Sequence, residues 1–161
     1  MDKNTLPLTL VETCEEDLAN LCSWFDSLDE VRDWGGPQMS FPVSLATLVA
    51  ETNFNKVLSY KLIDSKNTML AFGQCYDRLG RCHFARLIVN PRYRGRGFGK
   101  QLVMQLLEQE TEKNSLKVFS LFVWPHNQVA KSLYLSLGFQ VVDYPEAMTT
   151  EMAECDYLIK D

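Results

Sequence analysis

Residues that hold metals or disulfides are scarce in this sequence. It has two histidines and five cysteines among 161 residues, and the cysteines are Cys14, Cys22, Cys75, Cys82 and Cys155. No two of them have the spacing of a zinc motif, and their odd number does not suit a disulfide framework. We therefore expect reduced thiols, a cytoplasmic location and no bound metal.

Long apolar runs are also missing. No stretch approaches the roughly 20 apolar residues that a membrane-spanning helix needs, and the N-terminal stretch MDKNTLPLTLVETCEEDL lacks the basic and then apolar pattern of a secretion signal. We expect neither export nor a membrane partner. The apolar fraction of 46% and the charged fraction of 23% are ordinary for a globular protein, so we expect one domain over residues 1–161.

Charge is unevenly distributed along the chain. The net charge is −5, and residues 12–33 hold eight acids against one base, whereas RYRGRGFGK at 92–100 holds four cations and three glycines. A basic spot this short suits a compact anion better than a nucleic-acid track. The alternative is an arginine–glycine RNA-binding segment, but such segments are usually repeated and disordered. We expect no nucleic-acid partner.

Hydrophobic periodicity and turn residues predict the order of elements. Strands are expected at residues 6–12, 56–64, 68–78, 81–90, 117–124, 139–144 and 153–161. Helices are expected at residues 15–28, 44–53, 97–113 and 127–137, with a loop at 33–42. This order predicts an α/β (α+β) fold, in which a mixed and mostly antiparallel sheet of about seven strands is flanked by about four helices.

The glycine-rich segment 92–100 lies between an apolar strand and an amphipathic helix. Its glycines let backbone N–H groups approach a ligand, and the start of the helix adds unpaired donors and the positive end of the helix dipole. These features predict a phosphate site. A Walker A loop does not fit, because Arg94 replaces its first glycine and Gln101 replaces its hydroxyl residue. A dinucleotide fingerprint lacks its third glycine.

Two stretches resemble the GNAT N-acetyltransferases. Arg94-x-x-Gly97-x-Gly99, directly after RLIVNP, resembles that family's acetyl-CoA signature. The stretch VFSLFVWPHNQVAKSLYLSLGF at 118–139 resembles its later motif of strand, asparagine, helix with a Leu-Tyr pair, and Gly-Phe. The two motifs cover about residues 81–143 in family order. The resemblance implies a GNAT-like sheet, opened between the fourth and fifth strands, and acetyl-CoA as the acetyl donor.

The resemblance also implies roles for the matched residues. The strand backbone that pairs with the pantetheine arm is here Leu87, Ile88 and Val89. The loop amides that cradle the pyrophosphate are here those of Gly95, Arg96, Gly97, Phe98, Gly99 and Lys100, with Arg94 at the first position of the signature. Asn127 corresponds to the asparagine that contacts the cofactor arm, and Tyr134 to the tyrosine that protonates the departing thiolate.

Helical spacing bears on Tyr134. The expected core stripe of its helix is Val129, Ala130, Leu133 and Leu137, and Asn127, Lys131 and Tyr134 lie on another face. We expect that face to be free for a ligand. The alternative is that Tyr134 is a half-buried packing tyrosine.

The general base has no familiar position in this sequence. Ribosomal-protein N-terminal acetyltransferases of the family carry a glutamate five residues before the asparagine, and Phe122 stands there. Neither that base nor that substrate class carries over. His83 and His126 are candidates because imidazole titrates near neutrality, and the alternative is that each is an ordinary strand or loop residue.

The function implied is transfer of an acetyl group from acetyl-CoA to a primary amine by direct attack. The backbone N–H of Val89 is a candidate donor to the thioester oxygen. The acids of 12–33, together with Trp24 and Trp34, favour a cationic small-molecule or peptide amine; the alternative is a solvated acidic face with Trp24 in the core. The alternative function is an inactive acyl-CoA sensor. The sequence fits a monomer or a homodimer.

Overall fold

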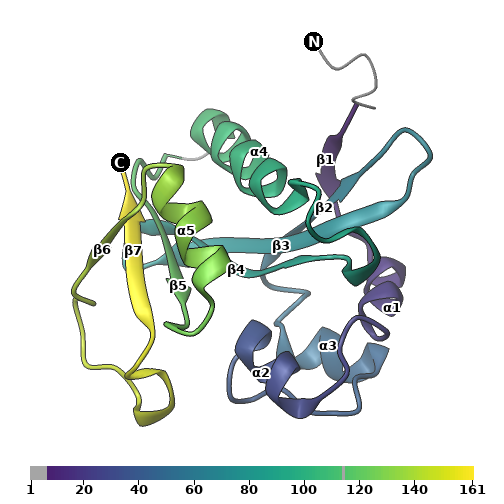
Figure 1. Cartoon of the computed structure of the whole chain (residues 1–161), viewed down its shortest axis with the longest axis horizontal. Helices are drawn as coiled ribbons and strands as arrows, with labels where there is room; N and C mark the ends of the chain where they lie inside the picture. The colour runs from purple at the N-terminus through teal and green to yellow at the C-terminus, as the bar shows by residue number, and fades with distance from the viewer. Residues whose placement is uncertain (1–6, 114) are drawn as a thin grey trace. The chain divides into compact units, whose positions relative to one another are not determined.

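The computed structural model describes residues 7–113 and 115–161 (Figure 1). Its strands are β1 (Thr9–Glu12), β2 (Leu58–Ile63), β3 (Met69–Arg78), β4 (Arg81–Val89), β5 (Phe119–Val123), β6 (Gln140–Val142) and β7 (Asp156–Lys160). Its α-helices are α1 (Leu18–Leu21), α2 (Leu28–Gly35), α3 (Leu45–Glu51), α4 (Phe98–Lys113) and α5 (Gln128–Ser136). Short 3₁₀ turns cover Glu15–Asp17, Pro91–Tyr93 and Thr150–Met152.

The seven strands form one sheet in the order β1-β2-β3-β4-β5-β7-β6. β1 pairs antiparallel with β2, as do β5 and β6 with β7, whereas β4 and β5 are parallel. The predicted mixed, mostly antiparallel sheet is therefore confirmed. The parallel register joins Cys82 to Phe119 and His83 to Ser120. Such a short pairing is consistent with the predicted opening between the fourth and fifth strands.

Contacts divide the chain into two compact units. The first comprises the chain up to Gln74 together with Arg86–Leu106, and the second comprises Cys75–Ala85 and Leu107–Asp161. The division falls within β3, β4 and α4, so the prediction of one domain over residues 1–161 stays a prediction. Among the residues that the structure describes, no helix is long and apolar enough to cross a membrane.

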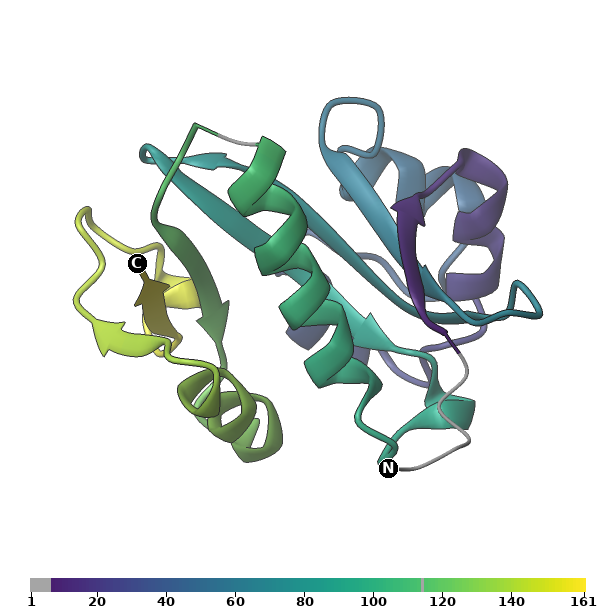
Figure 2. The same cartoon turned by 90° about the horizontal axis from the view of Figure 1, so that it is seen from above.

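The first unit has a core built from its three N-terminal helices and from β3. Leu18, Leu21, Val31, Leu48 and Phe72 have no exposed surface. Burying each such side chain contributes roughly 1.5–3 kcal/mol. In Figure 2, β1 (purple) lies beside β2 at the edge of this unit. β1 begins at Thr9, and Leu6, where we expected it to start, lies outside the described residues.

The helix α2 is a correction to the sequence prediction. One helix was expected over 15–28 and a loop over 33–42, but α1 ends at Leu21 and α2 occupies 28–35. The physical reason is the N-cap, because Ser27 Oγ accepts from the backbone N–H of Glu30 at 3.1 Å. α2 then ends at Gly35, and its C-cap is Gly36, whose φ of 108° suits glycine.

The second unit packs aromatic and aliphatic side chains from its strands. Phe84 and Phe119 lie with ring centroids 5.5 Å apart, and Leu121, Phe139 and Leu158 are almost fully buried. α5 begins after its N-cap, Asn127, and is followed by Gly138 at φ 97°, close to the predicted ends.

Candidate functional site

The glycine-rich loop is anchored to the end of β4. The Asn90 side chain accepts from the backbone N–H of Arg92 at 3.1 Å and donates to the carbonyl of Met69 at 3.0 Å. Its backbone N–H donates to the carbonyl of Leu70 at 2.8 Å. These bonds fix where the chain leaves the strand, and therefore where the loop begins.

The loop backbone has the properties of an anion cradle. Gly95 and Gly97 have φ values of 77° and 85°, and a Cβ atom at either position would meet no protein atom within 4 Å. Outside the bonds internal to helices and strands, the described structure records no backbone acceptor for the N–H groups of Gly95 through Lys100. The first N–H groups of α4 have no partner within the helix either. The loop therefore offers open, unpaired donors at the start of a 16-residue helix.

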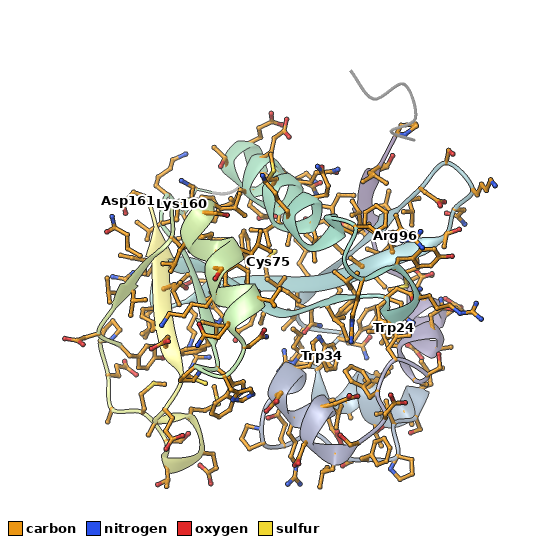
Figure 3. The ribbon with its side chains drawn as sticks, in the orientation of Figure 1. Trp24, Trp34, Cys75, Arg96, Lys160 and Asp161 are labelled. Carbon is orange, nitrogen blue, oxygen red and sulfur yellow. The ribbon has the colours of Figure 1, made fainter. Side chains whose placement is uncertain are left out.

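The cations of the loop are held in two different ways. Arg94 Nε donates to the carbonyl of Val89 at 3.3 Å, which ties the loop back to β4. The Arg96 guanidinium lies over the ring of Tyr93, 5.4 Å from its centroid (Figure 3). Lys100 is exposed. The positive charge therefore stays beside the open amides and strengthens the case for a phosphate ligand.

The last residues of β4 direct part of their backbone away from β3, where it can meet a ligand. Because the N–H of Asn90 points to β3, strand alternation directs the N–H of Val89 away from β3. That direction suits the predicted donation to a thioester oxygen. Leu87, Ile88 and Val89 are all half-buried rather than sealed in the core.

Arg86 is a feature that the sequence prediction missed. It has a φ of 52° inside β4, in the left-handed region that non-glycine residues rarely adopt. Its Nη1 donates to Gln74 Oε1 at 2.8 Å, and Gln74 Nε2 in turn donates to Ser59 Oγ at 2.9 Å. This buried network holds the irregular residue in place immediately before Leu87. Nothing in the local sequence pattern signals the change in backbone direction.

Asn127 and Tyr134 lie on α5 in different environments. Asn127 is exposed, and its Oδ1 accepts from the N–H of Ala130 at 3.3 Å as the N-cap. Its side-chain N–H groups are thus the part left for a ligand. Tyr134 is 8% exposed, and its ring lies 6.1 Å from that of Phe139. Burial raises the pKa of its phenol to about 12.

The predicted faces of α5 need correction. Val129, expected in the core stripe, is 86% exposed, whereas Tyr134 is the buried residue of the helix. The prediction that Tyr134 lies on a face of α5 that is free for a ligand is therefore wrong. The Tyr134 ring is turned inward, and Val129 faces the solvent. Lys131 pairs instead with Asp156 at 2.8 Å.

Within the described part of the chain, the contacts of Phe122 include no carboxylate that could act as the base. Its ring lies 5.1 Å from His83 and 5.3 Å from both Tyr144 and Tyr157, and the Arg78 guanidinium lies 5.0 Å from its centroid. His83 is 2% exposed, and its Nδ1 lies 2.8 Å from Ser120 Oγ.

The two histidines differ in exposure. His126 is exposed and stacks on Trp124 at 6.0 Å. The packing of His83 agrees with an ordinary strand residue, so His126 is the more accessible candidate base.

The acidic segment of the first unit is largely solvent-exposed. Asp17 is an exception, because it pairs with Lys61 Nζ at 2.8 Å. Its remaining members, Glu12, Glu15, Glu16, Asp26, Asp29, Glu30 and Asp33, are exposed. Trp24 is 6% exposed and belongs to the core, whereas Trp34 is half-buried with an indole N–H that has no partner (Figure 3). These exposed acids lie on β1, in the 3₁₀ turn before α1, in the α1–α2 connection and on α2.

Comparison with known proteins agrees with this arrangement. Residues 24–139, more than half of the chain, match the sequence model described as the Acetyltransferase (GNAT) family. The chain therefore belongs to the acetyltransferase (GNAT) family, and the predicted family is confirmed.

Two curated relatives carry the same kind of name. An uncharacterized N-acetyltransferase YycN of Bacillus subtilis (strain 168) is 41% identical over 51 residues, which are 32% of this chain and 32% of that protein. The [ribosomal protein bS18]-alanine N-acetyltransferase of Haemophilus influenzae is 33% identical over 102 residues, which are 63% of this chain and 67% of that protein. The first match thus spans less than two thirds of that relative's length.

Solved structures show the same fold. The spermidine N-acetyltransferase from Vibrio cholerae in complex with CoA and spermine superposes with a TM-score of 0.73 at 18% identity, covering 95% of this chain and 94% of that one. The ribosomal-protein-S18-alanine N-acetyltransferase from Escherichia coli gives a TM-score of 0.64 at 24% identity, covering 95% and 91%. The predicted GNAT-like fold is confirmed.

Proposed function

We propose that this chain transfers an acetyl group from acetyl-CoA to a primary amine by direct attack. The observation that carries the proposal is the loop before α4, where Gly95 and Gly97 adopt left-handed backbone conformations and the amides up to Lys100 are open. Several converging N–H donors can bind a pyrophosphate without a metal. Arg94 and Lys100 add positive charge.

The remaining residues of the donor site follow from the family. We assign the backbone of Leu87, Ile88 and Val89 to the amides of the pantetheine arm, which a strand edge can pair as it would another strand. The Asn127 side-chain N–H groups, which the helix cap leaves unused, are assigned to the same arm. Acetyl-CoA supplies the activated acyl group, and the Val89 N–H donates to the thioester oxygen as negative charge develops there.

The acceptor must reach the thioester as a neutral amine. An alkyl ammonium with a pKa near 10.4 is neutral in only about one molecule in a few thousand at pH 7. With Phe122 in place of the glutamate, a carboxylate does not take the proton at that position. Desolvation of the ammonium, or a base that acts through water such as His126, lowers this barrier.

Tyr134 is assigned to the departing sulfur. Because burial raises the pKa of its phenol to about 12, Tyr134 is protonated throughout the neutral range. A thiol titrates near 8.5, so full transfer of the phenolic proton to a free thiolate is uphill. We therefore assign Tyr134 as a hydrogen-bond donor that stabilises the sulfur while the bond breaks, with the attacking nitrogen as the ultimate source of the proton.

We propose a cationic acceptor on the basis of the exposed acids within residues 12–33, three of which lie on α2. Exposed carboxylates steer a cation toward the protein, and the effect weakens as salt screens it. The test is a pair of variants with equal charge change. Asp29→Asn with Asp33→Asn is expected to lower kcat/KM for a polyamine several-fold, whereas Glu146→Gln with Glu151→Gln in the second unit leaves it unchanged. Equal loss in both variants would count against the cationic acceptor.

The donor assignment is tested by thiol release from acetyl-CoA across polyamines, aminoglycosides, amino acids and short peptides. Gly97→Glu should abolish coenzyme A binding, because bulk and negative charge enter the cradle. Gly80→Glu is a matched control, since Gly80 has a similar left-handed φ (77° against 85° at Gly97) and equally open surroundings in the β3–β4 turn. If both variants bind coenzyme A normally, the phosphate assignment is wrong. Tight binding without turnover on any amine would favour an acyl-CoA sensor.

A further inference from the structure

Three buried side chains of the second unit, none of them assigned to the acetyl transfer, lie close together. Cys75 on β3, Cys82 on β4 and Glu110 on α4 place their sulfur and carboxylate atoms within 4.8 Å of one another (Figure 3 labels Cys75). Their exposures are 3%, 1% and 3%. The β3–β4 hairpin, which turns at Leu79 and Gly80, brings the two cysteines together, and the second half of α4 supplies the carboxylate.

The chemistry of this trio is that of a metal-binding set. Buried carboxylates in proteins are paired, hydrogen-bonded or bound to a metal ion. Thiolate sulfur and carboxylate oxygen are both zinc ligands, and three protein ligands with a water in the fourth position are a common zinc arrangement. A tetrahedral ion with metal–sulfur bonds of about 2.3 Å needs its sulfurs about 3.8 Å apart. The three ligand atoms are therefore within roughly 1 Å of the required spacing.

We propose that Cys75, Cys82 and Glu110 form a buried site for a thiophilic divalent cation such as Zn²⁺. The ion would join the β3–β4 hairpin to α4 within the second unit and stabilise the folded chain. Such a site would run against the sequence expectation of no bound metal. That expectation rested on linear spacing, whereas the two cysteines lie seven residues apart around a hairpin and the glutamate lies on a distant helix.

Binding would displace protons. The hydrogen bond that the Cys75 thiol donates to Cys82, its burial and the nearby Glu110 charge all raise the pKa of the Cys75 thiol well above its ordinary value. Zinc binds thiolate and not thiol, so each thiolate that forms on binding releases one proton. Metal affinity should consequently rise with pH.

The test titrates Co²⁺ into the reduced, metal-free full-length chain. We expect the visible d–d bands of a tetrahedral cobalt–thiolate centre, saturation at one equivalent, and loss of the bands when Zn²⁺ is added. At a hundredfold excess of Zn²⁺ over its dissociation constant, the melting temperature should rise by about 5–10 °C. Both responses should be strongly reduced in Cys82→Ala and in Glu110→Gln.

Cys155→Ala is the matched control, because Cys155 is a half-buried free thiol of the same unit outside the trio. It should keep the cobalt spectrum and the thermal shift. Glu110→Gln preserves the side-chain shape, so it tests the site even if Cys82→Ala folds poorly. The proposal is overturned if the parent shows no thiolate bands, or if Cys82→Ala and Glu110→Gln retain them. Oxidation of Cys75 and Cys82 to a disulfide in place of metal uptake would also overturn it.

Discussion

Tyr134→Phe is the most informative perturbation of the proposed reaction. The variant removes one hydroxyl from a side chain that is 8% exposed and leaves the ring packed against Phe139. Coenzyme A affinity and fold should therefore be retained. Removing one hydrogen-bond donor to charge that develops in the transition state typically costs a factor of about a hundred to a thousand, and we expect kcat to fall by a factor in that range.

The pH dependence makes the same experiment sharper. The ratio of parent to Tyr134→Phe activity cancels every titration that the two proteins share, including that of the acceptor amine. The pH dependence of this ratio therefore reports only the protonated fraction of the Tyr134 phenol. With the pKa at about 12, about 97% of the phenol is still protonated at pH 10.5, whereas an ordinary tyrosine with a pKa of 10 would be about a quarter protonated.

The assay is thiol release at saturating acetyl-CoA between pH 7 and 10.5, with calorimetry of coenzyme A binding as the control for integrity of the donor site. We expect the ratio to be large and nearly constant. A ratio of one at every pH would refute the role of Tyr134. A ratio that falls about fourfold by pH 10.5 would instead refute the inference that burial has raised its pKa.

Three further predictions concern stability, measured by thermal or denaturant unfolding. Arg86→Gly should be more stable than Arg86→Ala by about 1 kcal/mol, because both lose the bond to Gln74 but only glycine relieves the left-handed φ; equal stabilities would contradict this. Ser27→Ala should cost about 1 kcal/mol through loss of the α2 cap, whereas Ser65→Ala in an exposed turn should cost little. Above pH 10 the parent should lose stability, by about 2.3 kcal/mol at pH 12, because the unfolded tyrosine ionises first, and Tyr134→Phe should not show this loss.

Periodicity and turn residues predicted most of the elements because these signals are local. α4 keeps one apolar stripe over four turns, and its observed start at Phe98 lies one residue from the prediction. α2 was missed although Leu28, Val31 and Trp34 recur at helical spacing, because the glycines and prolines of WGGPQMSFP at 34–42 were taken to mark a loop. The signal that could have found it is the serine cap with Glu30 three residues later.

The parts of the candidate site that could not be predicted depend on tertiary contacts. The left-handed conformation of Arg86 is held by Gln74, twelve residues earlier in the chain, and no local propensity encodes it. The inward orientation of Tyr134 depends on its contact with Phe139, beyond the end of its own helix. In both cases the residue type was known, but the partner that fixes its geometry lies outside the local window.

The donor half and the acceptor half of the proposed reaction differ in how far a sequence can specify them. Pyrophosphate is bound by backbone N–H groups. Such binding needs glycines and the start of a helix, and both can be recognised in a short stretch of sequence. An amine is bound and deprotonated by side chains whose identity varies with the acceptor. Here Phe122, held among His83, Tyr144 and Arg78, takes the position of the glutamate. The motif therefore identifies the donor, while the acceptor has to be inferred from charge and tested by turnover.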